Sequence, residues 1–322
     1  MCTTIQIDYE GGTVLGRNMD WDMEVDYHIL YLPADYEYGR DLYGNPLKSR
    51  YRMLGMCFRK MNPLKDGVNE HGLMGCTNMF LQMNLYSAKV SPGKINLSAL
   101  DFFNYALANY RTCRELAADL PNLHIAKRDY QGNKVISPDF HYYFSDAHGD
   151  TLLIEPQNQE LKALPNPYRV MTNSPSLDHH ARALEKTFQK NGREFHPAKD
   201  LPGGYDPVSR FIKAYYLNQH IADAKTCTQA LENAYSILEA LKIPEAFTKT
   251  RYDYTFTRYI SAYDATSRLL TVRSHMNPRV YALRLDDLAH LKDRTFIPVP
   301  RQLTLDCLFP QDSVTPSDLT SQ

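Results

Sequence analysis

Residues 1–21 are MCTTIQIDYEGGTVLGRNMDW, and the rest of the chain can be organised outward from them. Residues 3–9 alternate apolar and polar side chains, residues 10–12 are Glu-Gly-Gly, and residues 13–17 resume the strand pattern. Two such runs joined by a short glycine turn predict a β-hairpin. The chain is therefore expected to begin with two antiparallel strands, with Cys2 at the start of the first.

Cys2 becomes chemically unusual if it is the amino terminus. Methionine aminopeptidases remove Met1 when the next residue is small, and Cys2 would then carry both a thiol and a free α-amine. An α-amine titrates near neutral pH, so it can act as general base for the thiol of its own residue. Most second-position cysteines have no chemical role, so this assignment depends on the motifs described below.

Composition and charge exclude several classes of function. The chain has 322 residues, of which 43% are hydrophobic and 23% charged, as in ordinary globular proteins. Its 36 Lys and Arg balance 37 Asp and Glu, which leaves no basic excess for nucleic acid or an anionic membrane. No window reaches the roughly 18 apolar residues of a membrane helix, and no secretory leader is evident. We expect a cytoplasmic protein that binds neither nucleic acid nor membrane.

Cysteine and histidine spacing indicates neither a metal nor a cofactor. The 6 cysteines include no CxxC pair, and the 11 histidines form no HExxH or HxH cluster. Cys57, Cys76 and Cys113 have apolar neighbours and are expected in the core. His179 and His180, at the start of a helical stretch, are expected to face solvent. No P-loop or GxGxxG motif signals a nucleotide.

Hydrophobic periodicity predicts blocks of strands separated by blocks of helices. Further strands are expected at 28–32, 51–58, 67–79 with an internal turn at 69–72, 140–145, 151–155, 255–264, 269–273 and 279–285. Helices are expected at 97–110, 112–120, 209–218 and 226–241. Residues 33–50 are expected to form a surface loop, and 161–163 and 168–172 to continue the sheet of 140–155.

This order favours an α+β fold over alternating βαβ units. We expect a single domain over residues 1–309, with two stacked, mainly antiparallel sheets and helices outside, followed by a loose tail at 310–322.

Short motifs along the chain resemble the choloylglycine hydrolase family, N-terminal nucleophile (Ntn) amidohydrolases that include bile salt hydrolases and penicillin V acylases. In order, they are Met1-Cys2-Thr3, GRNMDW at 16–21, NEHGL at 69–73, VMTNSP at 170–175, and LPGG at 201–204 followed by SRF at 209–211. The resemblance covers positions 1–285. It implies the four-layer αββα sandwich of Ntn hydrolases, loss of Met1 on maturation, and a homotetramer.

The resemblance also implies catalytic roles around Cys2. The Cys2 thiol would attack an amide carbonyl and form a thioester, with its own α-amine moving the proton. Arg17 would lie beside the thiol and favour the thiolate. Asp20 would accept a hydrogen bond from the Cys2 amine, and Arg210 would help to hold Asp20 and the nucleophile in place. Trp21 is expected to pack rather than react.

Two asparagines are candidates for binding the oxyanion. Asn173, at the end of a strand, would direct its amide N–H at the developing charge. The family places an Asn or Tyr six residues after the Leu of the hairpin motif, and counting from Leu73 reaches Met79, which cannot donate. Asn78 lies one position earlier, where a strand side chain has the opposite face. Either a local bulge turns Asn78 inward or a backbone N–H donates instead.

The resemblance implies hydrolysis of a linear C–N amide between an acyl group and a small polar amine, so the expected partner is a small-molecule acyl amide. We favour glycine- or taurine-conjugated bile acids; penicillin V, other N-acyl amides and N-acyl homoserine lactones are the alternatives. Pocket walls are expected from Met19 and from residues 22–27, 56–65 and 130–140. Two other classes remain open: a Cys–His hydrolase with an internal cysteine, and a catalytically silent binding protein on the same fold.

Overall fold

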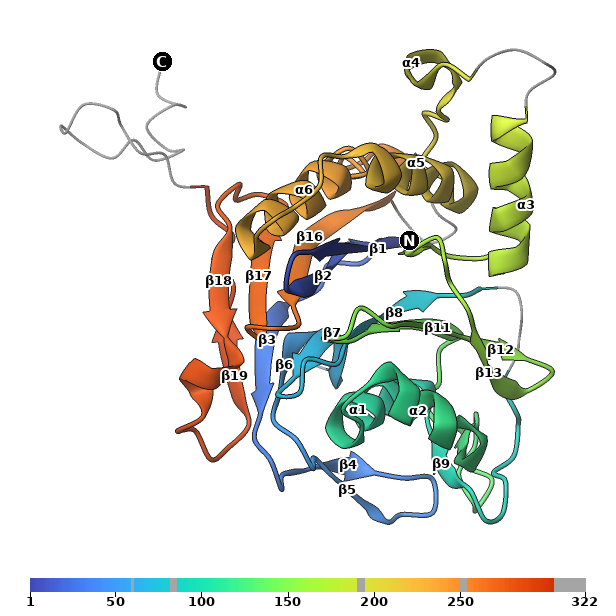
Figure 1. Ribbon diagram of the computed structural model, residues 1–322. Coiled ribbons are helices and arrows are strands. Elements are labelled where there is room, and N and C mark those ends of the chain that lie inside the picture. Colours follow the sequence, from blue (N-terminus) through green and yellow to red (C-terminus); the bar gives the residue numbers. More distant parts are fainter. Residues whose placement is uncertain (59–60, 82–85, 190–194, 250–253, 304–322) are drawn as a thin grey trace.

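The computed structural model describes residues 1–58, 61–81, 86–189, 195–249 and 254–303. Two large sheets stack face to face, and helices cover both outer faces (Figure 1). This is the four-layer αββα arrangement that the resemblance implied. The expected tail at 310–322 and Cys307 lie outside the described residues.

The first sheet contains the amino terminus. Its strand order is β14-β1-β2-β16-β17-β18, with β15 paired to β16, and these pairings are antiparallel. Its strands are β1 (Cys2–Tyr9), β2 (Gly12–Trp21), β14 (Val170–Met171), β15 (Thr248–Lys249), β16 (Tyr254–Asp264), β17 (Leu269–Ser274) and β18 (Tyr281–Arg284). The predicted hairpin is confirmed: Tyr9 pairs with Gly12, and Gly11 takes the left-handed φ of 94° that its turn requires.

The second sheet is also antiparallel, in the order β13-β12-β11-β8-β7-β6-β3-β19. Its strands are β3 (Tyr27–Leu32), β6 (Met53–Phe58), β7 (Met61–Asn69), β8 (Met74–Met79), β11 (Phe140–Ser145), β12 (Thr151–Gln157), β13 (Glu160–Leu164) and β19 (Thr295–Pro298). Two small sheets accompany it, formed by β4 (Glu37–Arg40) with β5 (Pro46–Lys48), and by β9 (Ile95–Leu97) with β10 (Leu123–Ile125).

Two sequence predictions about these strands are wrong. Residues 33–50 are not all loop, because β4 and β5 pair there. Residues 168–172 do not continue the sheet of 140–155, because β14 pairs with β1 in the other sheet. Between β13 and β14, Arg169 takes a φ of 56° and its carbonyl accepts from the Gln6 N–H, which turns the chain towards β1. An apolar strand pattern cannot tell which of two stacked sheets the strand joins.

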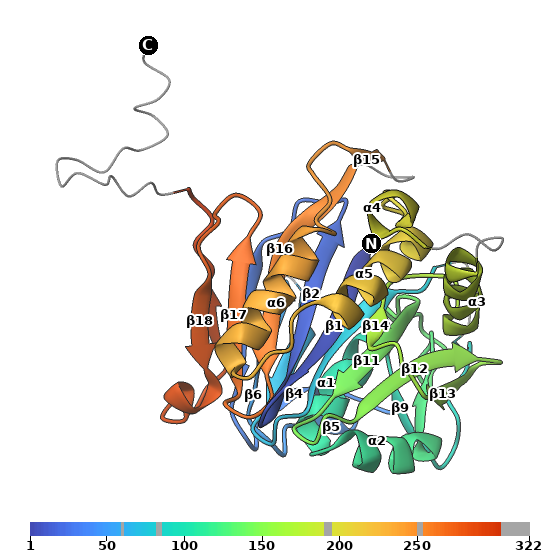
Figure 2. The same cartoon turned by 45° about the horizontal axis from the view of Figure 1, so that its top comes forward.

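Helices complete the outer layers (Figure 2). The first sheet is covered by α5 (Pro207–His220) and α6 (Cys227–Glu239), and the second by α1 (Ala99–Asn109) and α2 (Cys113–Asp119). The remaining helical segments are α3 (Leu177–Phe188), α4 (Pro197–Asp200) and the 3₁₀ turns Leu120–Asn122 and Leu285–Leu288. Polar caps define the helix starts: Ser98 accepts from the Asp101 N–H, Thr112 from the Glu115 N–H, and Asp206 from the Val208 and Ser209 N–H groups. Among the described residues, no helix is both long and apolar enough to cross a membrane.

Gly16 allows α6 to pack closely on β2. A Cβ at Gly16 would lie 2.9 Å from Leu238 Cδ1 and 3.4 Å from Ala234 Cβ, both on α6. The side chains on either side of Gly16 in sequence, Leu15 and Arg17, point to the opposite face of the strand because the side-chain period is two. Helix packing on one face thus sets the position of Arg17 on the other.

The predicted core positions of three cysteines are confirmed, since Cys57, Cys76 and Cys113 are buried. The prediction for His180 is wrong: His179 is exposed, but His180 is 3% exposed and stacks on Phe211 of α5, 4.8 Å between ring centroids. The helix begins two residues before the histidines, at Leu177, and this phase turns His180 towards α5.

Candidate active site

Cys2 faces a small pocket at one end of the stacked sheets. The thiol-bearing residue is 2% exposed, and the pocket it lines has a volume of about 40 Å³. The other described residues of its wall are Arg17, Met19, Trp21, Phe58, Lys65, Thr77, Met79, Leu100, Pro138 and Phe140. Apart from Arg17, Lys65 and Thr77, these side chains are apolar, which suits an acyl group.

The wall agrees in part with the sequence prediction. Met19 and residues from 56–65 and 130–140 do line the pocket. Residues 22–27 do not; Asp22, Glu24, Val25 and Tyr27 line a separate hollow of about 570 Å³. Trp21 packs edge-on against Phe58, with ring centroids 5.9 Å apart, so it also forms part of the wall.

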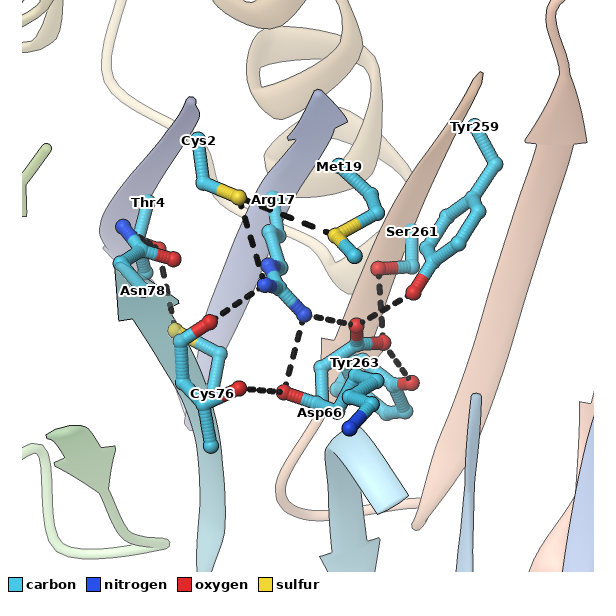
Figure 3. Close-up of polar contacts among 12 residues, drawn as sticks. Cys2, Thr4, Arg17, Met19, Asp66, Cys76, Asn78, Tyr259, Ser261 and Tyr263 are labelled. Carbon is cyan, nitrogen blue, oxygen red and sulfur yellow. Dashed lines mark hydrogen bonds and ion pairs between the residues drawn. The ribbon is translucent and has the colours of Figure 1, made fainter. Parts of the chain in front are cut away.

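Arg17 lies directly beside the Cys2 thiol. Its Nη2 donates to Cys2 Sγ at 3.4 Å, and the thiol also lies 3.7 Å from Met19 Sδ (Figure 3). The two residues meet because Cys2 pairs with Met19 in the β1–β2 hairpin, which brings Arg17 to the same sheet face as Cys2. The guanidinium is 2% exposed. Burial alone would lower its pKa, but the attraction of Cys2 and then of Asp66 outweighs burial and raises the pKa of Arg17 well above its usual range.

Asp66 of β7 holds Arg17 from the opposite sheet, and the sequence analysis missed it. Asp66 Oδ2 lies 2.5 Å from Arg17 Nη1, and the fully buried carboxylate also accepts hydrogen bonds from three hydroxyls of β16 (Figure 3). These donors are Tyr259 at 2.9 Å, Ser261 at 3.0 Å and Tyr263 at 2.5 Å. The carbonyls of Lys65 and Thr77 accept further bonds from Arg17. The only sequence signal was a charged residue inside an otherwise buried strand, which does not identify its partner.

The backbone nitrogen of Cys2 is held by Asn173, and Arg210 holds Asn173 in turn. Cys2 N donates to Asn173 Oδ1 at 2.7 Å, and the same oxygen accepts from Arg210 Nη2 at 2.8 Å. Arg210 also donates to the Cys2 carbonyl and, at 2.7 Å, to Thr3 Oγ1. It is fully buried, and burial lowers its pKa, against the attraction of Asp20 and Cys2. Three of the sequence-predicted residues therefore meet at one oxygen atom, Asn173 Oδ1.

Asp20 lies next to this cluster. Its Oδ1 accepts from Thr257 Oγ1 at 2.6 Å, while Oδ2 has no hydrogen-bond donor among the described residues. Its carbonyl accepts from the Met1 ammonium at 3.0 Å. Burial raises the pKa of Asp20, against the attraction of Arg210 and of the amino terminus. A buried carboxylate oxygen without a donor, close to the amino-terminal ammonium, can accept a hydrogen bond from a new amine there.

Asn78 points into the space between the sheets. Its Nδ2 donates to the Thr172 carbonyl at 2.8 Å and lies 3.4 Å from Thr4 Oγ1, and its pairing with β11 shows no register shift. The neighbouring Met79 lines the Cys2 pocket instead, and its carbonyl accepts from Asn173 Nδ2 at 2.9 Å. β8 thus contacts the site through both faces.

Two buried histidines support the Asn173 segment, and the sequence analysis assigned them no role there. His180 Nε2 lies 2.8 Å from the Asn173 carbonyl, and His141 Nε2 lies 3.1 Å from the Thr172 carbonyl. Burial is the main reason that the pKa of His180 is lowered to about 4, so it is neutral at neutral pH. A neutral imidazole can donate from Nε2 to the Asn173 carbonyl.

The described residues contain no group of three or more His, Cys, Asp or Glu side chains that could hold a metal ion. Of the charged groups at Cys2, Arg17 is paired with Asp66, and Arg210 donates to the Cys2 carbonyl and to Asn173. The site therefore places a buried cation beside the buried Cys2 thiol.

Comparison with known proteins identifies the family. Residues 2–297 match linear amide C–N hydrolases of the choloylglycine hydrolase family. A bile salt hydrolase/transferase from Clostridium perfringens (strain 13 / Type A) is 24% identical over 310 residues, which cover 89% of this chain and 93% of that protein.

Solved structures agree with the fold. The C2A mutant of the conjugated bile acid hydrolase from Clostridium perfringens superposes with a TM-score of 0.83 at 22% identity, covering 96% of this chain and 100% of the other. A penicillin V acylase from Agrobacterium tumefaciens gives 0.75 at 22% identity, covering 91% and 88%. The four-layer fold, the cysteine at the start of β1 and the match over nearly the whole chain lead to one conclusion: this chain belongs to the choloylglycine hydrolase family and is a hydrolase of linear amide C–N bonds.

Proposed function

We propose that this chain, once Met1 has been removed, cleaves an acyl amide with Cys2 as nucleophile, and that its substrates are conjugated bile salts. The observation that carries the mechanism is the contact of 3.4 Å between Arg17 Nη2 and Cys2 Sγ inside a mostly apolar pocket. A fixed, buried cation stabilises a thiolate.

The proton path follows from the position of the Cys2 nitrogen. After Met1 leaves, this nitrogen is an α-amine beside Asn173 Oδ1, in a residue whose thiol lies 3.9 Å from the Asp20 carbonyl. It accepts the thiol proton as Sγ attacks the amide carbonyl carbon, and later donates that proton to the leaving amine. Water then attacks the thioester, releasing the carboxylic acid and restoring the thiol. Asn173, Arg210 and Asp20 act in this scheme by orienting the amine.

Asn173 and Asn78 are the proposed donors to the oxyanion. Each side-chain amide has two N–H groups, and one of them already donates to a carbonyl, of Met79 and Thr172 respectively. Arg210 holds Asn173 Oδ1, which fixes the orientation of its amide. Removing one oxyanion donor costs about 2.7–4 kcal/mol of transition-state stabilisation, so Asn173→Ala should lower kcat by roughly two to three orders of magnitude.

The relatives support the choice of substrate. One bears the name bile salt hydrolase/transferase, and a similar structure is that of a penicillin V acylase. The relatives' names point to two substrates: the glycine or taurine amide of a steroid acid, which we favour, and the phenoxyacetyl amide penicillin V. Other N-acyl amides and N-acyl homoserine lactones are further alternatives.

The first experiment combines intact mass with an amine-release assay. The intact masses of the purified protein and of its Cys2→Ala variant are measured. Each protein is then assayed for amine release from taurocholate, glycocholate and penicillin V. We expect loss of Met1 in both, and cleavage of the bile salts by the unmodified enzyme alone. Cleavage that survives in Cys2→Ala overturns the mechanism and supports an internal cysteine. Loss of Met1 without cleavage of any of the three supports either another acyl amide as substrate or a silent binding protein.

We further propose that residues 1–309 act as one domain, that the chain assembles as a homotetramer, and that it works in the cytoplasm. Free thiols support the last point, because Cys2, Cys57, Cys76, Cys113 and Cys227 are unpaired. Light scattering of the purified protein, expected to give four times the chain mass, tests the assembly.

A further inference from the structure

Lys65 brings a second cation into the Cys2 pocket. It lies on β7 next to Asp66, is 3% exposed and lines the same pocket as Cys2 and Arg17. Its ammonium lies 5.4 Å from the ring centroid of Phe58 and 5.7 Å from that of Phe140. Both rings belong to the pocket wall, so the ammonium lies within the lining of the cavity.

No anion neutralises this ammonium within the described residues: no carboxylate lies within 4.0 Å of it, and no hydrogen bond of its Nζ is recorded. The adjacent Asp66 is committed elsewhere, because its two oxygens accept from Arg17, Tyr259, Ser261 and Tyr263. Asp101 of α1 attracts Lys65 only from a distance, and its Oδ2 accepts from Ser98 Oγ at 2.5 Å.

Keeping such a charge costs stability. Burial is the largest cause that lowers the pKa of Lys65, to about 8, and the repulsion of Arg17 adds to it. Cys57, Asp66 and Asp101 partly oppose that shift. Aromatic rings stabilise a cation, but less than a partnered carboxylate does. A methionine would fill the same space at no electrostatic cost, so the lysine calls for a functional explanation.

We infer that Lys65 is a specificity-determining residue for a further substrate class beside the bile salts, and that it binds a carboxylate carried by the acyl part of that substrate, as in a half-amide of a dicarboxylic acid. The inference rests on the proposed amide hydrolysis. The acyl part is the half that remains on Cys2 as the thioester while the amine departs, so it occupies the enclosed pocket and the amine the open side. Within that pocket Arg17 already has its anionic partner in Asp66, and Lys65 has none.

Binding of small amides tests this recognition without turnover. The full chain carrying Cys2→Ala is titrated calorimetrically with succinamate, glutaramate and adipamate, and with butanamide, pentanamide and hexanamide as neutral amides of equal length. We expect the carboxylated member of at least one pair to bind on the order of tenfold more tightly, as one charge-assisted hydrogen bond allows. The acyl chain length at which the carboxylated amide gains most over the neutral amide indicates the distance between position 2 and the Lys65 ammonium.

Three variants assign the effect to Lys65. In Lys65→Met and in Lys65→Gln, which retains polarity, the affinity ratio of the carboxylated to the neutral amide should fall to about one. Thermal unfolding checks that each variant is folded. Lys162→Met is the matched control, because Lys162 is an exposed lysine of β13 paired with Glu160, and it should leave the ratio unchanged. Equal binding of each pair in the Cys2→Ala protein, or a preference that survives in both Lys65 variants, overturns the inference.

The pH dependence gives a second readout. The titratable and charged groups around Lys65 are Arg17 of β2, Cys57 of β6, Asp66 of β7, Asp101 of α1 and Cys2 of β1. Because the ammonium loses its proton near pH 8, preference for the carboxylated amide should decline between pH 7 and 9; a constant preference contradicts the assignment to Lys65.

A separate assay detects failure of the proposed function. If the unmodified enzyme releases glycine from neither N-adipoylglycine nor N-hexanoylglycine, the proposed amide hydrolysis is wrong, whatever the binding data show.

Discussion

At the scale of the residue, the cation beside the Cys2 thiol is held in place by the opposite sheet. Arg17 reaches Cys2 from β2, but its charge is balanced by Asp66 of β7. Removing one partner of a buried ion pair leaves the other charge uncompensated, which typically costs about 3–5 kcal/mol. Asp66 is thus a positioning residue: it never touches the thiol but determines where the guanidinium lies.

Asp66→Asn should therefore lower both stability and activity. We expect a loss of about 3 kcal/mol in the free energy of unfolding from the uncompensated Arg17, and a fall in kcat larger than the change in KM. Urea unfolding and steady-state kinetics measure the two. Asp150→Asn is the control, because Asp150 is exposed and lies 3.8 Å from the exposed Arg114, where a pair contributes little. Equal effects of the two variants would contradict the role of Asp66.

His180 makes stability depend on acid pH. Its pKa in the folded protein is about 4, below the ordinary 6.5, so the unfolded chain binds the proton first as pH falls. The contribution of His180 to the free energy of unfolding is fully present above about pH 6.5. It should decline by about 3 kcal/mol as the pH falls to 4, at 1.36 kcal/mol per pKa unit. Urea unfolding of His180→Gln over the same range should lack this component. The same slope in both proteins would assign the loss to other groups.

At the scale of the element, close packing of α6 against β2 places the strand that carries Arg17. Gly16 and Leu238 make this approach possible, since a Cβ at residue 16 would come within 2.9 Å of Leu238 Cδ1. Asn18 Nδ2, on the same face, donates to the Leu238 carbonyl at 2.9 Å and connects the two elements again. A shift of α6 would therefore move β2 and, with it, the guanidinium on the opposite face.

Gly16→Ala should destabilise the protein by about 1–3 kcal/mol through overpacking. Shortening Leu238 to alanine relieves the clash with a methyl group at residue 16. The double variant Gly16→Ala with Leu238→Ala should therefore be destabilised by less than the sum of the two single variants. Thermal unfolding of both single variants and the double variant completes the cycle. Strict additivity would show that the methyl group is accommodated elsewhere.

At the scale of the whole molecule, the Cys2 pocket is only part of the available space. Its volume is about 40 Å³, which is too small for a steroid acyl group. A second hollow of about 480 Å³ lies next to it between α1 and the segments around residues 40–44 and 129–136, and Leu100 lines both. The steroid acyl group of the proposed bile salt substrates requires the larger space, so we expect Leu100 to move when such a substrate binds.

Leu100→Ala should connect the two spaces permanently. We expect KM for a bulky acyl amide such as glycocholate to fall relative to that for N-butanoylglycine, at a cost in stability of about 2–5 kcal/mol. The ratio of kcat/KM for the two substrates is the measurement. Leu107→Ala on the same helix, fully buried and absent from both pocket walls, is the control for general loosening of α1. An unchanged ratio would place the entry of the acyl group elsewhere.

The sequence by itself determined the elements whose signals are local. The β1–β2 hairpin, the capped helices α1 and α2, and the position of Cys2 follow from periodicity, turn residues and caps within a few residues of one another. The resemblance added Arg17, Asn173 and Arg210, which the structure brings together around Cys2.

Only the tertiary structure decided which distant residues meet. β14 joins the first sheet, and His180 turns inward. Asp66 and Lys65 enter the site from β7, where Asp66 is 49 positions from Arg17 in the sequence. A strand pattern specifies which side chains share a face but not which sheet lies opposite that face. The charges that control Cys2 are contributed across the gap between the two sheets, so they could be recognised only once the sheets were stacked.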